Sequence, residues 1–156
     1  MANQPLPSVS RAFTPDSKME LGREGAMTGL IVVAGRALFA FIFILSSPRL
    51  FQPAAINAAA QHGVPIAEIL VPVAGVLAGL GGLSVLLGYR AKIGAWLIAI
   101  FLLVVTPVMH NFWAVADPAM AQAQMVNFMK NVAMLGGALL ITQFGAGPWS
   151  LDARRR

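Results

Sequence analysis

The stretch "MTGLIVVAGRALFAFIFIL", residues 27–45, is an apolar run interrupted by a single arginine, Arg36. A helix needs about 20 mostly apolar residues to cross the hydrocarbon core of a bilayer, and this run has that length. Three further apolar runs follow at residues 66–88, 93–113 and 124–144. They do not alternate between polar and apolar residues as barrel strands do. The sequence therefore predicts an all-α fold, a four-helix bundle that spans the membrane.

The composition supports a membrane environment and excludes several kinds of chemistry. The 156 residues are 58% hydrophobic and 11% charged, whereas charged residues make up about a quarter of a soluble domain. The absence of cysteine excludes disulfides, thiol catalysis and Cys-ligated metal sites within this chain. The net charge of +5 comes from basic residues beside the apolar runs, which is typical of membrane topology, so we expect no nucleic-acid partner.

The segments outside the apolar runs divide the chain into three parts. Residues 1–26 are polar and contain prolines, and they predict a cytoplasmic N-terminal arm. The run that follows has no small-x-small cleavage site, so we expect it to be retained rather than removed as a signal peptide. Residues 27–149 form the predicted transmembrane domain, and residues 150–156 a basic cytoplasmic tail. Between the first two spans, the alanine-rich residues 54–61 predict a short interfacial helix.

The distribution of basic residues predicts the orientation in the membrane. In a four-span arrangement, Arg49 is the one basic residue that falls clearly in the opposite loops. The remaining basic residues that bear on topology lie on one side: Arg11, Lys18, Arg23, Arg90, Lys92, Arg154, Arg155 and Arg156. The positive-inside rule then places both termini in the cytoplasm, and we expect a multi-pass protein of a bacterial inner membrane.

A group of polar residues within or beside the apolar runs is the candidate ligand site. Arginine at the centre of a membrane helix costs at least about 2.5–3.5 kcal/mol, so Arg36 is expected to be bonded to helix carbonyls or polar side chains, or directed at a ligand. The spacing of Asn127, Lys130 and Asn131 places them on one helix face. The outer ends of the other spans contribute the rest of the predicted site: Glu68, His110, Asn111 and Trp113.

Each of these residues also has a structural interpretation. His110 is the one histidine expected in a span, and a simple hydrogen bond would satisfy it. Lys130 can extend its ammonium group outward along its own stem. Glu68 is the natural ionic partner of Lys130 or Arg36. Below Glu68, small residues recur on one helix face and predict a helix-packing seam: Gly75, Gly79 and Gly82.

Known cofactor sites and catalytic motifs find little support in the sequence. Two-histidine haem ligation would need a second histidine inside a span, and a metal site would need more carboxylates or histidines. No Ser–His–Asp signature, phosphate-binding loop or dinucleotide-binding motif is present. We therefore expect no metal and no cofactor held by the chain itself, and whether it is an enzyme stays open. The positive and amide-rich site would suit a quinone head group or a lipid phosphate.

Several motifs resemble the DoxX family of small four-helix membrane proteins. They are "GRALFAFIFILSSPRLF" (35–51), "AAAQHGVP" (58–65), "GGLSVLLGYRAKIGA" (81–95), "HNFW" (110–113), "NFMKNVAMLGGALL" (127–140) and "GPWSLDARR" (147–155). The resemblance covers the chain from about Gly29 to its end. It implies quinone-linked redox work in association with a partner subunit, because the family is named after subunits associated with a quinol oxidase.

Three hypotheses for function follow. The first is a quinone-associated accessory subunit of a respiratory or oxidoreductase complex, in which any redox step needs a bound quinone or a partner. The second is a non-catalytic structural subunit or membrane anchor that docks a partner membrane protein or a second copy through the glycine seam. The third is a small transporter or lipid-handling protein.

Overall fold

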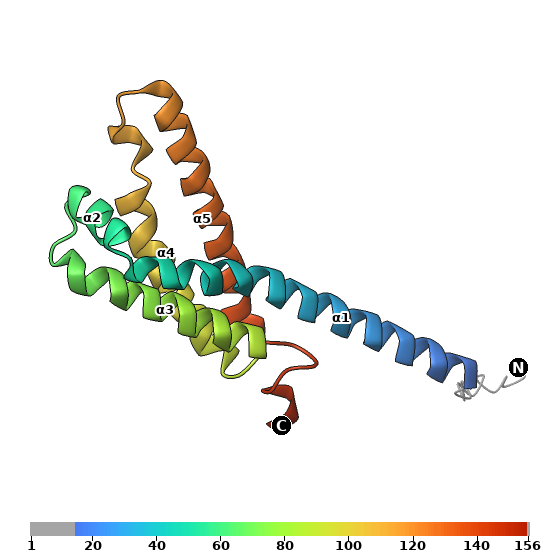
Figure 1. Cartoon of the computed structure of the whole chain (residues 1–156). Coiled ribbons are helices and arrows are strands. Elements are labelled where there is room, and N and C mark those ends of the chain that lie inside the picture. Colours follow the sequence, from blue (N-terminus) through green and yellow to red (C-terminus); the bar gives the residue numbers. More distant parts are fainter. Residues whose placement is uncertain (1–14, 156) are drawn as a thin grey trace, which may run out of the picture.

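The computed structural model describes residues 15–155, in which all the regular secondary structure is helical (Figure 1). The five α-helices are α1 (Pro15–Ser46), α2 (Pro53–Gln61), α3 (Ala67–Leu87), α4 (Ala91–Met109) and α5 (Pro118–Phe144). Short 3-10 helices follow α1, α4 and the C-terminal loop: η1 (Ser47–Phe51), η2 (Phe112–Ala114) and η3 (Ala153–Arg155). Four segments are long and apolar enough to cross a membrane: Gly22–Phe51, Ala67–Leu87, Ala91–Ala114 and Pro118–Phe144. The prediction of an all-α fold with four apolar spans is confirmed.

The long helices pack mainly against their neighbours along the chain. Extensive contacts join α1 to α3, α3 to α4 and α4 to α5, whereas α1 and α5 meet over a small area that includes Phe39 and Gly137. Figure 1 shows α1 and α3 lying together and α5 rising away from them. The fully buried side chains are mostly alanines, with Ile98 and Leu102 of α4 at the centre. Small side chains let helix backbones approach closely, which is how membrane helices gain packing energy.

The glycines of α3 provide its contact surface for α1. A Cβ atom on Gly75 would stand 3.1 Å from the Cβ of Leu50, and one on Gly82 would stand 3.2 Å from the carbonyl oxygen of Ala40. Gly79 faces Ser47, whose hydroxyl donates to the Gly75 carbonyl at 2.8 Å. The predicted glycine seam is thus covered by α1 and η1 of the same chain.

Two helices begin earlier than their hydropathy predicts. The helix α5 begins at Pro118 rather than residue 124, because the Asp117 side chain accepts a hydrogen bond from Met120 N at 2.7 Å and Pro118 suits the first helical turn. The helix α1 begins at Pro15, so residues 15–26 of the predicted polar arm are helical. The rest of that arm, residues 1–14, lies outside the described residues. Capping and backbone propensity decide where a helix starts, whereas hydropathy reports only where it can be immersed in lipid.

A tight turn joins α3 to α4 and depends on Gly88. Its φ of 64° is in the left-handed region, and Tyr89 N and Gly88 N bond back to the carbonyls of Ser84 and Val85. This is a Schellman C-cap, which strongly favours glycine. A Cβ at position 88 would also stand 2.6 Å from the Nη1 atom of Arg36. Both backbone conformation and space therefore require glycine here.

The close contact between α3 and α4 gives a matched test of the packing. A Cβ on Gly81 would stand 2.8 Å from the carbonyl oxygen of Gly94, whereas Gly136 of α5 has nothing within 4 Å. We expect Gly81→Ala to lower the free energy of unfolding in detergent by about 1–3 kcal/mol, the usual effect of overpacking. Gly136→Ala should leave it unchanged or slightly raised, since alanine favours a helix. Equal effects of the two substitutions would contradict the α3–α4 contact.

Candidate functional site

Arg36 of α1 is buried, at 5% exposure, and is bonded to the C-terminal loop that follows α5. Its Nη1 atom donates to the Ala146 carbonyl at 2.8 Å, and its Nη2 atom donates to the Trp149 carbonyl at 3.0 Å. Its Nε atom is buried without a hydrogen-bond partner among the residues from 15 to 155. Carbonyls outside any helix are unsatisfied within secondary structure, so they are available acceptors for a buried guanidinium.

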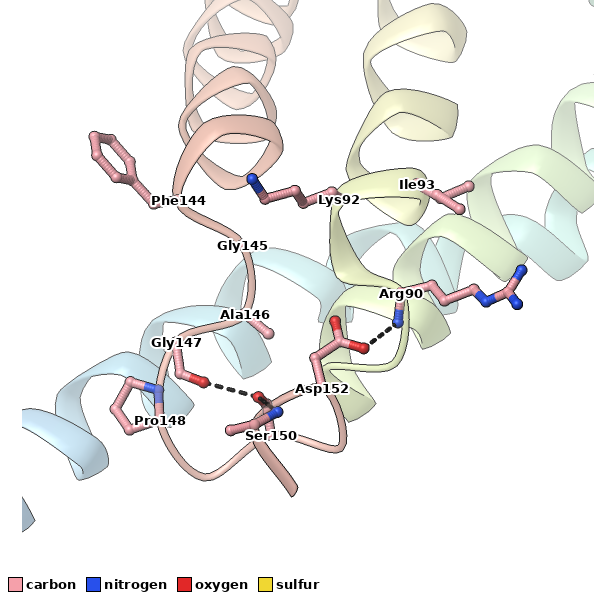
Figure 2. Close-up of a pocket in the computed structure, with 11 residues that line it drawn as sticks. Arg90, Lys92, Ile93, Phe144, Gly145, Ala146, Gly147, Pro148, Ser150 and Asp152 are labelled. Carbon is pink, nitrogen blue, oxygen red and sulfur yellow. Dashed lines mark hydrogen bonds between the residues drawn. The ribbon is translucent and has the colours of Figure 1, made fainter. Parts of the chain in front are cut away.

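The C-terminal loop is fixed on its other side to the α3–α4 turn. The two carboxylate oxygens of Asp152 accept hydrogen bonds from Arg90 N at 2.8 Å and Ala91 N at 3.0 Å, and so cap the start of α4 (Figure 2). Two backbone bonds, Leu151 N to Leu87 O and Asp152 N to Gly88 O, continue this contact. Asp152 is also near enough to act electrostatically on the Arg36 charge. The junction therefore joins α1, the α3–α4 turn and the end of the chain.

A cavity of about 530 Å³ lies between the start of α4 and this loop. Figure 2 shows Lys92 extending toward Phe144 and Gly145, while the guanidinium of Arg90 points away from the loop. Apolar side chains of Ile93, Phe144 and Pro148 form other parts of the lining. The cavity thus combines a cation, backbone polar groups and an apolar wall.

The predicted outer polar residues lie at the opposite end of the molecule. His110 follows α4 directly, and its Nδ1 atom is 2.8 Å from the Oε1 atom of Gln124 on α5. Next to it, the rings of Phe112, Trp113 and Phe128 pack edge to face with centroids 5.1–5.9 Å apart. Half-buried Asn111 begins the same turn. This hydrogen bond and these rings connect the C-terminal end of α4 to the N-terminal half of α5.

The remaining predicted site residues are only partly brought together. Asn127 and Asn131 of α5 are half-buried, and Lys130 between them is exposed. Glu68 is exposed in the first turn of α3, and α3 makes no extensive contact with α5 in the described residues. The structure therefore gives Lys130 no direct partner in Glu68.

Arg36 is not brought together with this outer group. It stands level with Gly88, at the end of α3, whereas Glu68 is at the start of α3 and His110 is at the end of α4. Because Arg36 is at the midpoint of its apolar run, the sequence suggests that it lies at the centre of the bundle. The segment formed by α1 and η1 is shifted along α3, however, so that Gly82 packs on Ala40 and Gly75 on Leu50. The sequence correctly indicates that the guanidinium is bonded inside the protein, but not that the C-terminal loop supplies the acceptors.

An apolar groove of about 490 Å³ lies between α2, α3 and α4, near the end of the molecule that holds His110. Its lining is almost wholly aliphatic, from Leu50 of η1 to Val104 and Met109 of α4, with His62 as the one ionisable side chain. Such a lining suits an acyl chain or another apolar group. No three His, Cys, Asp or Glu side chains between residues 15 and 155 gather into a metal site.

The sequence reasoning missed Ala146, Trp149, Asp152 and Gln124. Backbone carbonyls are the same at every position, and the hydrogen bond from Ala91 N to Asp152 joins residues 61 positions apart. Neither feature produces a recognisable local pattern in the sequence. The segment "GAGPWSLD" did carry one signal, because closely spaced glycines favour positive φ, and Gly145 and Gly147 have φ of 76° and 69°. Such a loop can fold back on the protein rather than continue as a free tail.

Comparison with known proteins identifies relatives of the chain. A family model described as the SURF4 family matches residues 13–156. The "Inner membrane protein YphA" of Escherichia coli (strain K12) is 26% identical over 132 residues, which cover 83% of this chain and 94% of that protein. No solved structure matches. The resemblance to the DoxX family is therefore wrong as a family assignment, because the family model that matches nearly the whole chain is a different one.

The Arg36 junction predicts a specific effect of removing the guanidinium. We expect Arg36→Gln to lower the free energy of unfolding by about 1.5–3 kcal/mol, the usual contribution of hydrogen bonds to a charged group. It should also expose residues 145–155 to added protease. This exposure can be measured as the rate of cleavage upstream of a C-terminal tag. The control is Arg23→Gln, on the exposed part of the same helix. Unchanged cleavage of the Arg36 variant would contradict the loop contact.

Proposed function

The chain belongs to the SURF4 family, and from this premise we propose that it is a non-catalytic protein of a bacterial inner membrane that docks a transmembrane helix of a partner protein on α5. The observation that carries the proposal is the polar face of α5, formed by Asn127, Lys130 and Asn131, at a level where α1 does not cover it. The membrane location is supported by four apolar spans and by similarity to YphA, which is named as an inner membrane protein.

The packing of α1 supports an open face on α5. The contact of Phe39 with Gly137 is six positions beyond Asn131 toward the C-terminal end of α5, about 9 Å along a helix. Above it, α5 rises away from α1 (Figure 1). The inward side of α5 from Asn127 to Met134 is half-buried rather than enclosed.

Hydrogen-bonding groups on this open face need partners in a bilayer. Among residues 15–155, the side-chain hydrogen bonds of α5 involve Gln124 and Thr142, and neither Asn127 nor Asn131. An amide left unpaired in hydrocarbon costs about 2 kcal/mol or more. A partner helix that brings polar side chains to this face would satisfy both amides, and such bonds are a usual means of association between membrane helices. A second copy of the chain is the other occupant to be tested.

The orientation is part of the proposal. Arg90, Lys92, Arg154 and Arg155 gather at the end that holds the C-terminus, and Arg49 follows α1 at the other end. The positive-inside rule then supports a cytoplasmic C-terminal end. In this orientation α2, the predicted interfacial helix, lies at the opposite surface of the same membrane.

The quinone hypothesis loses the two arguments that favoured it. One was the DoxX resemblance, and the other was a site in which Arg36 joins the outer polar group. A role in lipid handling is the second candidate, favoured by the aliphatic groove between α2, α3 and α4.

Site-specific photocross-linking tests the docking face. A photoreactive amino acid in place of Lys130 should give a cross-linked protein adduct in the native membrane. The same amino acid in place of Leu103, which is 57% exposed on α4, should react with lipid only. Mass spectrometry of the adduct then separates a partner protein from a second 16.5 kDa copy. Lipid adducts alone from both positions would refute docking on α5.

Cysteine labelling tests the orientation, because the natural chain has no cysteine to remove. With a membrane-impermeant maleimide on intact spheroplasts, Ala116→Cys in the loop before α5 should be labelled. Arg154→Cys should be labelled only after the membrane is opened. The reverse pattern would invert the proposed topology.

A further inference from the structure

The cavity between α4 and the C-terminal loop is lined by both charged and apolar side chains. The lining includes the ammonium group of Lys92, whose side chain reaches along the loop to within 3.5 Å of the Cβ position of Gly145 (Figure 2). Ile93, 54% exposed, and Phe144, 81% exposed, also line the cavity and lie on opposite sides of Lys92 (Figure 2). A ligand that fits both kinds of side chain must join an anionic group to an apolar body.

The charge around this cavity is strongly positive. Arg154 and Arg155 follow it in η3, and Arg155 stacks on the ring of Tyr89 at 4.8 Å. The buried guanidinium of Arg36 lies behind the loop, bonded to neutral carbonyls. Asp152, the acid in the lining, is already held by two backbone N–H groups. An anion entering beside Lys92 therefore meets an excess of cations.

The loop also offers backbone donors. In residues 15–155, no backbone carbonyl accepts a bond from the N–H groups of Ala146 and Gly147. Nearby, Trp149 is 56% exposed, and tryptophan is enriched at the level of lipid head groups. The cavity is therefore at the level expected for lipid head groups.

We propose that this cavity binds the phosphate of an anionic phospholipid, with Lys92 and the Ala146–Gly147 backbone on the phosphate and Ile93 and Phe144 against the acyl chains. Basic pockets beside membrane helices on the cytoplasmic side are suited to such lipids. The leaflet rests on the orientation proposed above, whereas binding itself does not. Bound lipid would hold the C-terminal loop against α4 and so reinforce the Arg36 junction.

The test measures thermal unfolding of the full chain in neutral detergent with added short-chain phosphatidylglycerol, phosphatidylcholine or inorganic phosphate. Phosphatidylglycerol should raise Tm in a saturable way, because a ligand that binds only the folded state stabilises it. Lys92→Gln should weaken the apparent affinity about fivefold. Lys92→Arg should retain most of it, and Lys130→Gln, at the other end of the molecule, should leave it unchanged.

Several outcomes would overturn the proposal. An equal rise of Tm with inorganic phosphate would make the ligand a free anion, and an equal rise with phosphatidylcholine would show lipid without head-group recognition. Unchanged affinity of the Lys92→Gln variant for phosphatidylglycerol would show that the lipid binds somewhere other than this cavity. If that variant fails to fold, native mass spectrometry of the natural chain decides, since anionic lipid should remain bound and phosphatidylcholine should not. These results are independent of cross-linking at position 130, so docking on α5 can fail while lipid binding stands.

Discussion

The fold depends on the way a buried guanidinium is satisfied. Arg36 sits on an apolar helix and is buried inside the protein, where a charge without hydrogen-bond acceptors is costly. The carbonyls of Ala146 and Trp149 supply them and thereby bring the end of the chain to the first long helix. Asp152 then reaches the start of α4, and Gly88 leaves room for all three segments. One side chain thus ties the C-terminal loop to α1, beside the α3–α4 turn.

Close helix packing accounts for the remainder of the described structure. Glycines and alanines on α3 and α4 allow backbones to approach, which matters because lipid provides no hydrophobic drive for helices to associate. This packing leaves one side of α5 open, because α1 packs on α3 and contacts α5 only near Gly137. The polar face of α5 lies on this open side, and it is the face on which we propose that a partner helix docks.

The two ends of the molecule differ in their chemistry. The end with the C-terminal loop gathers cations around a cavity that is also lined by apolar side chains, whereas the end with α2 carries aliphatic and aromatic surface and the hydrogen bond of His110 with Gln124.

The misleading resemblance to the DoxX family has a physical cause. The shared motifs are glycine-paired helices, basic turns and proline exits, which four-span helical proteins need for packing and topology whatever their function.

The sequence by itself determined the number of spans, their approximate limits and the side on which the cations gather, because hydropathy and charge act locally along the chain. It also indicated that Arg36 needs internal partners. Only the tertiary structure decided which groups these are, because carbonyls of residues 146 and 149 are indistinguishable in sequence from any others. The displacement of α1 along α3 separates Arg36 from His110 and Lys130. The register of one helix against another is set by close contacts between residues far apart in the sequence. The periodicity of apolar residues within a single helix therefore cannot predict it.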